Sequence, residues 1–281
     1  MIERVAELSA ALEARRAAAS TVGLVPTLGA LHDGHASLIE RAAAECDLAC
    51  VSIFVNPLQF TSAAEAAAYP RGLDADVVLA EKAGATVVFA PTLEEMYPQP
   101  PAVGVQIAGQ LGATLEGASR PGHLDGVATV VAKLFAMAGR CRAYFGEKDY
   151  QQLLVVRRLV ADLSFPVTVV ACPTVRGIDG VAESSRNRQL SSAERGAAPV
   201  LCRALRAGAA AVLAGGSEPG EVAGLMADIV AAEPLVELDY AVVVDAASLV
   251  VPERLVGELR LLVAARVGGT RLIDNVGVRV A

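Results

Sequence analysis

Short apolar runs rich in β-branched residues alternate with longer Ala- and Leu-rich segments through the first two thirds of the chain. The short runs predict strands at residues 21–25, 49–55, 86–89, 142–145 and 167–171. The longer segments predict helices at residues 35–45, 74–83, 127–138 and 150–162. Continuous apolar strands that alternate with helices are typical of a parallel sheet covered on both faces, so the pattern predicts an α/β fold. In such sheets ligands bind beyond the carboxyl ends of the strands.

The pattern changes after residue 173. A polar loop at 174–189 is followed by an Ala-rich helix that Ser191 or Ser192 could cap. Two glycines at 215–216 break that helix. A second helix is predicted at 219–232, and strands are predicted at 238–244, 261–265 and 270–275. Helices followed by strands favour a small α+β domain, so we predict two domains, residues 1–174 and 175–281.

Composition narrows the class of protein. The chain has 281 residues, of which 54% are hydrophobic, which is enough for a full-sized core. Its formal net charge of -7 gives no general attraction for nucleic acid, so any phosphate site must come from a local group of positive charges. We find no apolar run of the length a membrane span needs and no apolar leader at the start, so we expect a cytoplasmic protein.

The five cysteines are scattered and odd in number, and none stands in a zinc-binding arrangement with a histidine. We therefore expect buried free thiols in a reducing compartment.

Two histidines stand in the loop that joins the first predicted strand to the first predicted helix. His32 and His35 are accompanied by Gly29 and Gly34, which let the backbone approach a ligand closely. A helix N-terminus offers free N–H groups and the positive end of a dipole, and imidazoles add further donors. This loop therefore predicts a phosphate site that stabilises charge on an attacked phosphate. The alternatives are that His32 caps the helix while His35 packs on its first turn, or that the pair binds a metal.

Other polar side chains follow the later strands. Asn56 and Gln59 come after the second strand, and their amides suit a small hydroxy acid, although Asn-Pro also starts ordinary turns. Lys148 follows Gly146 and offers a point charge for phosphate, and Asp149 could cap the next helix or accept from a ribose hydroxyl.

The polar loop beyond residue 174 carries a second set of phosphate-binding groups. The hydroxyls of Ser184 and Ser185 and the guanidinium of Arg186 fit β- and γ-phosphates. For both this loop and Lys148, the alternative is a solvated basic surface.

The histidine spacing His-x-Gly-His resembles that of the nucleotidylyltransferase and class I tRNA synthetase superfamily. Six motifs then follow in order that resemble the pantothenate synthetase family, at residues 26–35, 53–60, 69–71, 115–123, 145–152 and 184–187. Asn-Pro-Leu-Gln-Phe and Gly-Glu-Lys-Asp-Tyr-Gln-Gln are the most specific of these. The resemblance covers nearly the whole chain.

The resemblance implies a Rossmann-like domain, a C-terminal lid domain, a homodimer, and an ATP-dependent ligation of pantoate to β-alanine through a pantoyl adenylate. It implies that Asn56, Gln59 and Gln152 hold pantoate, that Tyr69 lies near the mouth of that pocket, that His123 is a further pocket residue, and that Asp76 binds a magnesium ion. The implied catalytic residues are His32, His35, Lys148 and Arg186. The implied ATP-binding residues are Pro26, Thr27, Leu28, Gly29, His32, His35, Gly146, Lys148, Asp149, Ser184, Ser185 and Arg186.

Three positions depart from the family pattern. Ala75 stands where the family often has a second acid, Glu183 where it commonly has an apolar residue, and Leu28 where it usually has Met. Two other functions remain open: a nucleotidylyltransferase that stops at AMP transfer, which has no use for Asn56 and Gln59, and a non-catalytic ATP-binding protein.

Overall fold

The computed structural model describes residues 1–216 and 218–280. The chain divides into two compact units. The first unit contains Met1–Glu147 and Gln151–Pro173, and the second contains Lys148–Tyr150 and Thr174–Ala281.

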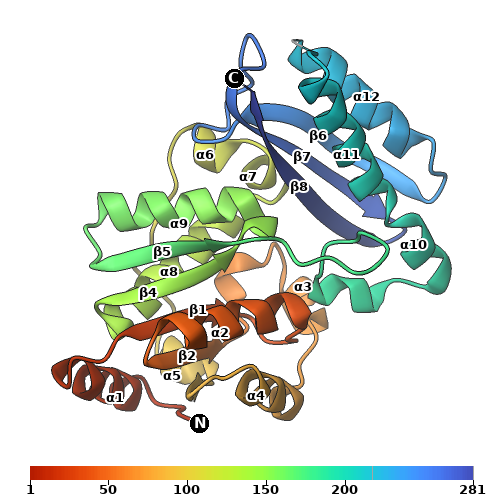
Figure 1. Cartoon of the computed structure of the whole chain (residues 1–281). Coiled ribbons are helices and arrows are strands. Elements are labelled where there is room, and N and C mark those ends of the chain that lie inside the picture. The colour runs from red at the N-terminus through yellow and green to blue at the C-terminus, as the bar shows by residue number, and fades with distance from the viewer. Residues whose placement is uncertain (217, 281) are drawn as a thin grey trace. The chain divides into compact units, whose positions relative to one another are not determined.

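The first unit contains a five-stranded parallel sheet of order β3-β2-β1-β4-β5 (Figure 1). Its strands are β1 (Val22–Thr27), β2 (Leu48–Ile53), β3 (Val87–Phe89), β4 (Cys141–Gly146) and β5 (Val167–Cys172). Four successive residues of β1, at positions 22–25, are buried, which requires that both faces of the sheet be covered. The α/β prediction is confirmed, and all five predicted strands are present within a few residues of their expected bounds.

The longer helices of this unit are α1 (Val5–Ala17), α2 (Asp33–Glu45), α4 (Leu73–Lys82), α8 (His123–Ala138) and α9 (Tyr150–Asp162). Short helices lie in the connections: η1 (Pro57–Gln59), α3 (Ala63–Ala68), α5 (Leu93–Met96), α6 (Gln110–Ala113) and α7 (Glu116–Ser119). The short helix η2 (Glu147–Asp149) spans the boundary, since Lys148–Tyr150 belongs to the second unit. Helix α1 was not predicted. Its apolar face is narrow, since only Leu8 and Leu12 are buried, and this gives a weak periodic signal.

The position of the loops follows from the register of the sheet. Thr27 is paired with Ile53, so β1 and β2 end at the same level, and Thr27 Oγ1 donates to the carbonyl of Ser52 at 2.7 Å. The loop that carries the two histidines and the loop that carries Asn56 therefore leave the same carboxyl edge side by side (Figure 1). This is the edge where parallel sheets bind ligands.

The second unit contains a three-stranded antiparallel sheet of order β6-β7-β8, made of β6 (Val236–Asp245), β7 (Gly257–Val267) and β8 (Thr270–Val280). Helices α11 (Val200–Leu213) and α12 (Pro219–Ala231) pack on it, and η3 (Ser185–Gln189) and α10 (Ser192–Ala197) precede them (Figure 1). The predicted α+β character is confirmed. The single Ala-rich helix expected from residue 191 is instead two helices that divide at Ala198 and Pro199, because proline cannot donate the hydrogen bond of a helix interior.

Residues Ser192–Leu213 are long and apolar enough to cross a membrane by length and composition, with a mean hydropathy of 1.3. We expected no such segment from the sequence. Half of the segment is buried inside the unit, and α11 contributes Val200, Leu201, Leu205 and Val212 to the hydrophobic core. This burial is typical of the core helix of a soluble protein.

Candidate active site

The loop before α2 places two imidazole rings together at the helix start. His32 is the N-cap, and its Nδ1 accepts a hydrogen bond from the N–H of Gly34 at 3.1 Å. The rings of His32 and His35 lie 4.0 Å apart between centroids. Because Nδ1 is an acceptor, the proton of the neutral His32 ring is on Nε2, which remains a donor. Capping and phosphate binding are therefore compatible in one residue.

The backbone of this loop is held by a buried carboxylate. Asp76 of α4 accepts from the N–H of Ala30 at 2.8 Å and from the N–H of Leu31 at 2.7 Å. Gly29 and Ala30 both have positive φ, of 84° and 50°. A non-glycine residue in that region is strained, so it needs support such as the two hydrogen bonds that Asp76 accepts.

Tyr69 also contacts the loop, since its hydroxyl donates to the carbonyl of Gly29 at 3.3 Å. The N–H of Gly29 donates to Thr27 Oγ1 at 3.2 Å. A cavity of about 520 Å³ opens beside this segment and is lined by Leu28, Gly29, Asp76 and mainly apolar residues of the neighbouring loops.

The second loop of the sheet edge is built around two buried amides. Asn56 is 0% exposed and Gln59 is 7% exposed. The Asn56 Nδ2 donates to Gln59 Oε1 at 3.1 Å and to the carbonyl of Gly126 at 3.0 Å. Asn56 Oδ1 accepts from the N–H of Leu58 at 3.3 Å and from the hydroxyl of Tyr97 at 3.1 Å. The structure therefore brings Asn56 and Gln59 together and joins their amides by a hydrogen bond. That the two amides bind one small acid stays a prediction.

His123 and Arg120 hold the main chain of the same loop. His123 Nδ1 donates to the carbonyl of Gln59 at 2.7 Å, and its Nε2 faces Arg120 NH1 at 2.9 Å. A carbonyl only accepts and a guanidinium only donates, so His123 is the neutral tautomer with its proton on Nδ1. Arg120 also pairs with Glu65 at 3.2 Å. His123 thus acts on the backbone of Gln59.

Gln152, the third amide that the resemblance assigns to pantoate, lies in the first turn of α9 with a half-buried side chain. Its helix follows β4, whose carboxyl end lies at the same edge of the sheet as those of β1 and β2. Its contact with the substrate stays a prediction.

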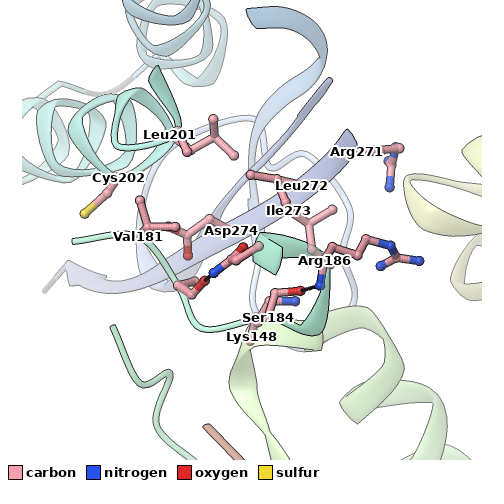
Figure 2. A pocket seen from close by; sticks show the side chains of 13 residues that line it. Lys148, Val181, Ser184, Arg186, Leu201, Cys202, Arg271, Leu272, Ile273 and Asp274 are labelled. Carbon is pink, nitrogen blue, oxygen red and sulfur yellow. Dashed lines mark hydrogen bonds between the residues drawn. The ribbon is translucent and has the colours of Figure 1, made fainter. Parts of the chain in front are cut away.

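The second unit brings Lys148, Ser184 and Arg186 together. All three line one small pocket of about 20 Å³, together with Asn187, Arg271 and Asp274 (Figure 2). Space of that size takes about one water, so a triphosphate needs these side chains to move. Ser184 caps η3, since its Oγ accepts from the N–H of Arg186 at 3.3 Å, and Ser185 is buried behind it. Asp149 lies 3.5 Å from Lys148 Nζ.

Lys148 is anchored by residues that the sequence did not single out. Asn275 Nδ2 donates to the carbonyl of Lys148 at 2.7 Å, and Arg260 Nε donates to Asn275 Oδ1 at 2.6 Å. The Arg260 guanidinium lies 4.0 Å from the ring centroid of Tyr150. These contacts explain why Lys148–Tyr150 groups with the C-terminal unit. Glu183, one of the departures from the family pattern, is not among the residues that line the pocket.

The carboxylate that the resemblance assigns to magnesium already holds two main-chain groups. Within residues 1–216 and 218–280, no three His, Cys, Asp or Glu side chains gather as metal ligands. Both oxygens of Asp76 already accept backbone N–H groups, and Ala75 supplies no second carboxylate. The assignment of magnesium to Asp76 stays a prediction from the resemblance.

Comparison with known proteins places this chain in a family. The family model described as pantoate-beta-alanine ligase matches residues 1–277. The pantothenate synthetase of Cereibacter sphaeroides is 51% identical over 278 residues, which is 99% of each chain. That of Moorella thermoacetica is 46% identical over 280 residues, covering 100% of this chain and 99% of the relative.

Solved structures of the same family have a similar fold. The crystal structure of pantothenate synthetase from Thermus thermophilus superposes with a TM-score of 0.92 at 49% identity, over 98% of both chains. The pantoate-beta-alanine ligase of Francisella tularensis, complexed with beta-gamma ATP and beta-alanine, gives a TM-score of 0.80 at 31% identity, over 98% of this chain and 97% of that one.

Proposed function

The chain belongs to the pantoate-beta-alanine ligase family, and from this premise we propose that it joins pantoate to β-alanine with ATP, releasing AMP and pyrophosphate. One observation carries the proposal within the structure. The imidazole pair after β1 and the amide pair after β2 leave one sheet edge at the same level. The side chains that we assign to phosphate and to the hydroxy acid thus follow strands that end at one level of the sheet.

The first step activates the acid. A carboxylate oxygen of pantoate attacks the α-phosphorus of ATP, a C(O)O–P bond forms, the bond to the β-phosphate breaks, and pyrophosphate leaves. The carboxylate is already a nucleophile, so no base is required. Catalysis consists of positioning and of stabilising negative charge on the phosphate. We assign the stabilisation to His32 and His35 in the first unit and to Lys148 and Arg186 in the second.

The second step forms the amide. The amine nitrogen of β-alanine attacks the carbonyl carbon of the adenylate, the C–N bond forms, and AMP departs with the electrons of the C–O bond. The nitrogen loses a proton to solvent or to a neighbouring base. Gln59 and Gln152 hold the pantoyl group through both steps.

Magnesium, which the resemblance implies, would neutralise charge on the triphosphate when bound. Because the carboxylate of Asp76 holds two backbone N–H groups, we assign no step to a protein-held metal ion. We further propose that residues 175–281 act as a lid, that the protein is a homodimer and that it works in the cytoplasm, as the resemblance implies.

An omission assay tests the proposal. AMP formation is measured with ATP, pantoate and β-alanine, and then with each left out in turn. We expect full AMP formation only with all three. A nucleotidylyltransferase would transfer AMP to another acceptor without pantoate, and a non-catalytic ATP-binding protein would bind ATP and form no AMP, so either result would contradict the proposal.

A further inference from the structure

The amide of Asn56 has no hydrogen-bonding capacity left for a substrate. A side-chain amide has two N–H donors and an oxygen with two lone pairs. In Asn56 both donors are used, by Gln59 Oε1 and the carbonyl of Gly126, and both lone pairs are used, by the N–H of Leu58 and the hydroxyl of Tyr97. The side chain is also fully buried. Asn56 is therefore built to hold other groups in place.

The orientation of the Asn56 amide is fixed by main-chain groups. The oxygen and nitrogen of an amide are assigned from their partners. Here the N–H of Leu58 can only donate and the carbonyl of Gly126 can only accept, so the oxygen faces Leu58 and the nitrogen faces Gly126. The reversed amide would set donor against donor and acceptor against acceptor, each left unsatisfied in a buried site.

The orientation of Gln59 follows from that of Asn56. The Asn56 Nδ2 group needs an acceptor, so Gln59 presents Oε1 to it and turns Nε2 the other way. Among the residues that the structure describes, Gln59 Nε2 has no acceptor, although the side chain is only 7% exposed. The main-chain carbonyl of Gln59 accepts from His123 Nδ1, which fixes the main chain at this residue. Gln59 therefore keeps an N–H donor for a ligand, and the direction of that donor is set by Asn56.

Tyr97 completes this arrangement. Its ring packs against Phe54 at 6.0 Å between centroids, and Lys133 Nζ lies 5.4 Å from the centre of the ring. Burial raises the pKa of the Tyr97 phenol to about 12, so the hydroxyl stays protonated and donating over the working pH range. The phenol fills the second lone pair of Asn56 Oδ1 and so stabilises its orientation.

We propose that Tyr97 and Asn56 are positioning residues that fix Gln59 as a one-way hydrogen-bond donor, so that the site accepts only acids that present an acceptor oxygen to Gln59 Nε2. The inference rests on the proposed function, because it identifies Gln59 as the group that contacts the hydroxy acid. On this proposal Asn56 orients the side chain of Gln59 and does not itself contact pantoate.

A double-mutant cycle tests the proposal. Tyr97→Phe keeps the ring and removes the hydroxyl, and we expect the KM for pantoate to rise about fivefold to tenfold while the KM for ATP changes less than about twofold. In a Gln59→Ala background the same Tyr97→Phe change is expected to alter the pantoate KM by less than about twofold, because the group on which it acts is gone. Equal effects in the two backgrounds, or no effect in the wild type, would overturn the proposal.

Two controls make the result specific. Tyr144→Phe removes a phenol from another buried tyrosine, which bonds Glu45 instead, and it is expected to leave the pantoate KM unchanged. If Gln59→Ala does not fold, Gln59→Glu serves as the background, since its carboxylate can accept from Asn56 but has no N–H to offer. An inactive wild-type chain would refute the proposed function, whereas an active wild type with additive mutations would refute only the positioning role.

Discussion

His32 combines a structural and a chemical task in one ring. Its Nδ1 caps α2 through the N–H of Gly34, and this fixes the tautomer that keeps a donor on Nε2. Asparagine is also a good N-cap, but it offers no donor at the position of Nε2. The two tasks can therefore be separated by substitution.

His32→Asn is expected to leave the free energy of unfolding within about 0.5 kcal/mol of the wild type, because the cap is kept. The value of kcat/KM is expected to fall about 100-fold or more, because a donor to the phosphate is lost. His32→Ala, the matched control, should lose both activity and stability. Denaturant unfolding and steady-state kinetics of the two variants check this, and a fully active His32→Asn enzyme would show that the imidazole only caps.

Asp76 holds the main chain of the loop that carries His32. Its two oxygens hold the N–H groups of Ala30 and Leu31, where the chain takes a positive φ before His32. Asn at this position would place an NH₂ group against one of those N–H donors. The loop would then lose a hydrogen bond and bring two buried donors together.

Asp76→Asn is expected to lower the stability by about 1–3 kcal/mol and to reduce kcat/KM, since the histidine loop is displaced. The measurement that distinguishes this role from magnesium binding is a magnesium titration of the activity. On the present account added magnesium does not restore the variant. Full restoration at high magnesium would instead assign Asp76 to the metal.

At the scale of the element, the first turn of α8 packs closely against the loop that carries Gln59. A Cβ on Gly126 would lie 2.1 Å from the carbonyl oxygen of Leu58 and 2.7 Å from the N–H nitrogen of Gln59. These are main-chain atoms, which cannot rotate away as a side chain can. Only glycine at 126 lets α8 approach so closely and accept the hydrogen bond from Asn56.

Gly126→Ala is therefore expected to raise the KM for pantoate and to lower the free energy of unfolding by about 1–3 kcal/mol, as overpacking commonly does. Gly224→Ala in α12 is the control, because no atom lies within 4 Å of the added Cβ, and helix propensity favours alanine by about 1 kcal/mol. Thermal unfolding of both variants measures the change in stability, and pantoate saturation curves measure the change in KM. A Gly126→Ala enzyme with wild-type KM would contradict the proposed contact.

The elements were predictable from the sequence where their apolar pattern is strong. The continuous runs of β1 and β2 and the alternation with α2 indicated the parallel sheet. The sequence did not predict the short helices of the connections. It predicted α10 and α11 as one helix, because alanine favours a helix on both sides of Pro199. The close approach of Gly126 to Leu58 could not be predicted, since no local pattern encodes a contact between residues so far apart.

At the scale of the whole molecule, the sequence identifies the residues with recognisable chemistry but not the residues that support them. His32, Lys148 and Arg186 stand out by type and spacing. Tyr97 and Asn275 carry no such signal, yet one orients Asn56 and the other holds the carbonyl of Lys148. Supporting residues depend on three-dimensional neighbours, so only the structure reveals them.

The proposed mechanism requires that this chain convert pantoate to an adenylate. Isotope exchange between labelled pyrophosphate and ATP measures that step without β-alanine. We expect label to enter ATP only when pantoate is present, and we expect exchange to be lost in His35→Ala. Exchange that does not depend on pantoate, or no exchange in a protein that forms AMP with all three substrates, would contradict this mechanism.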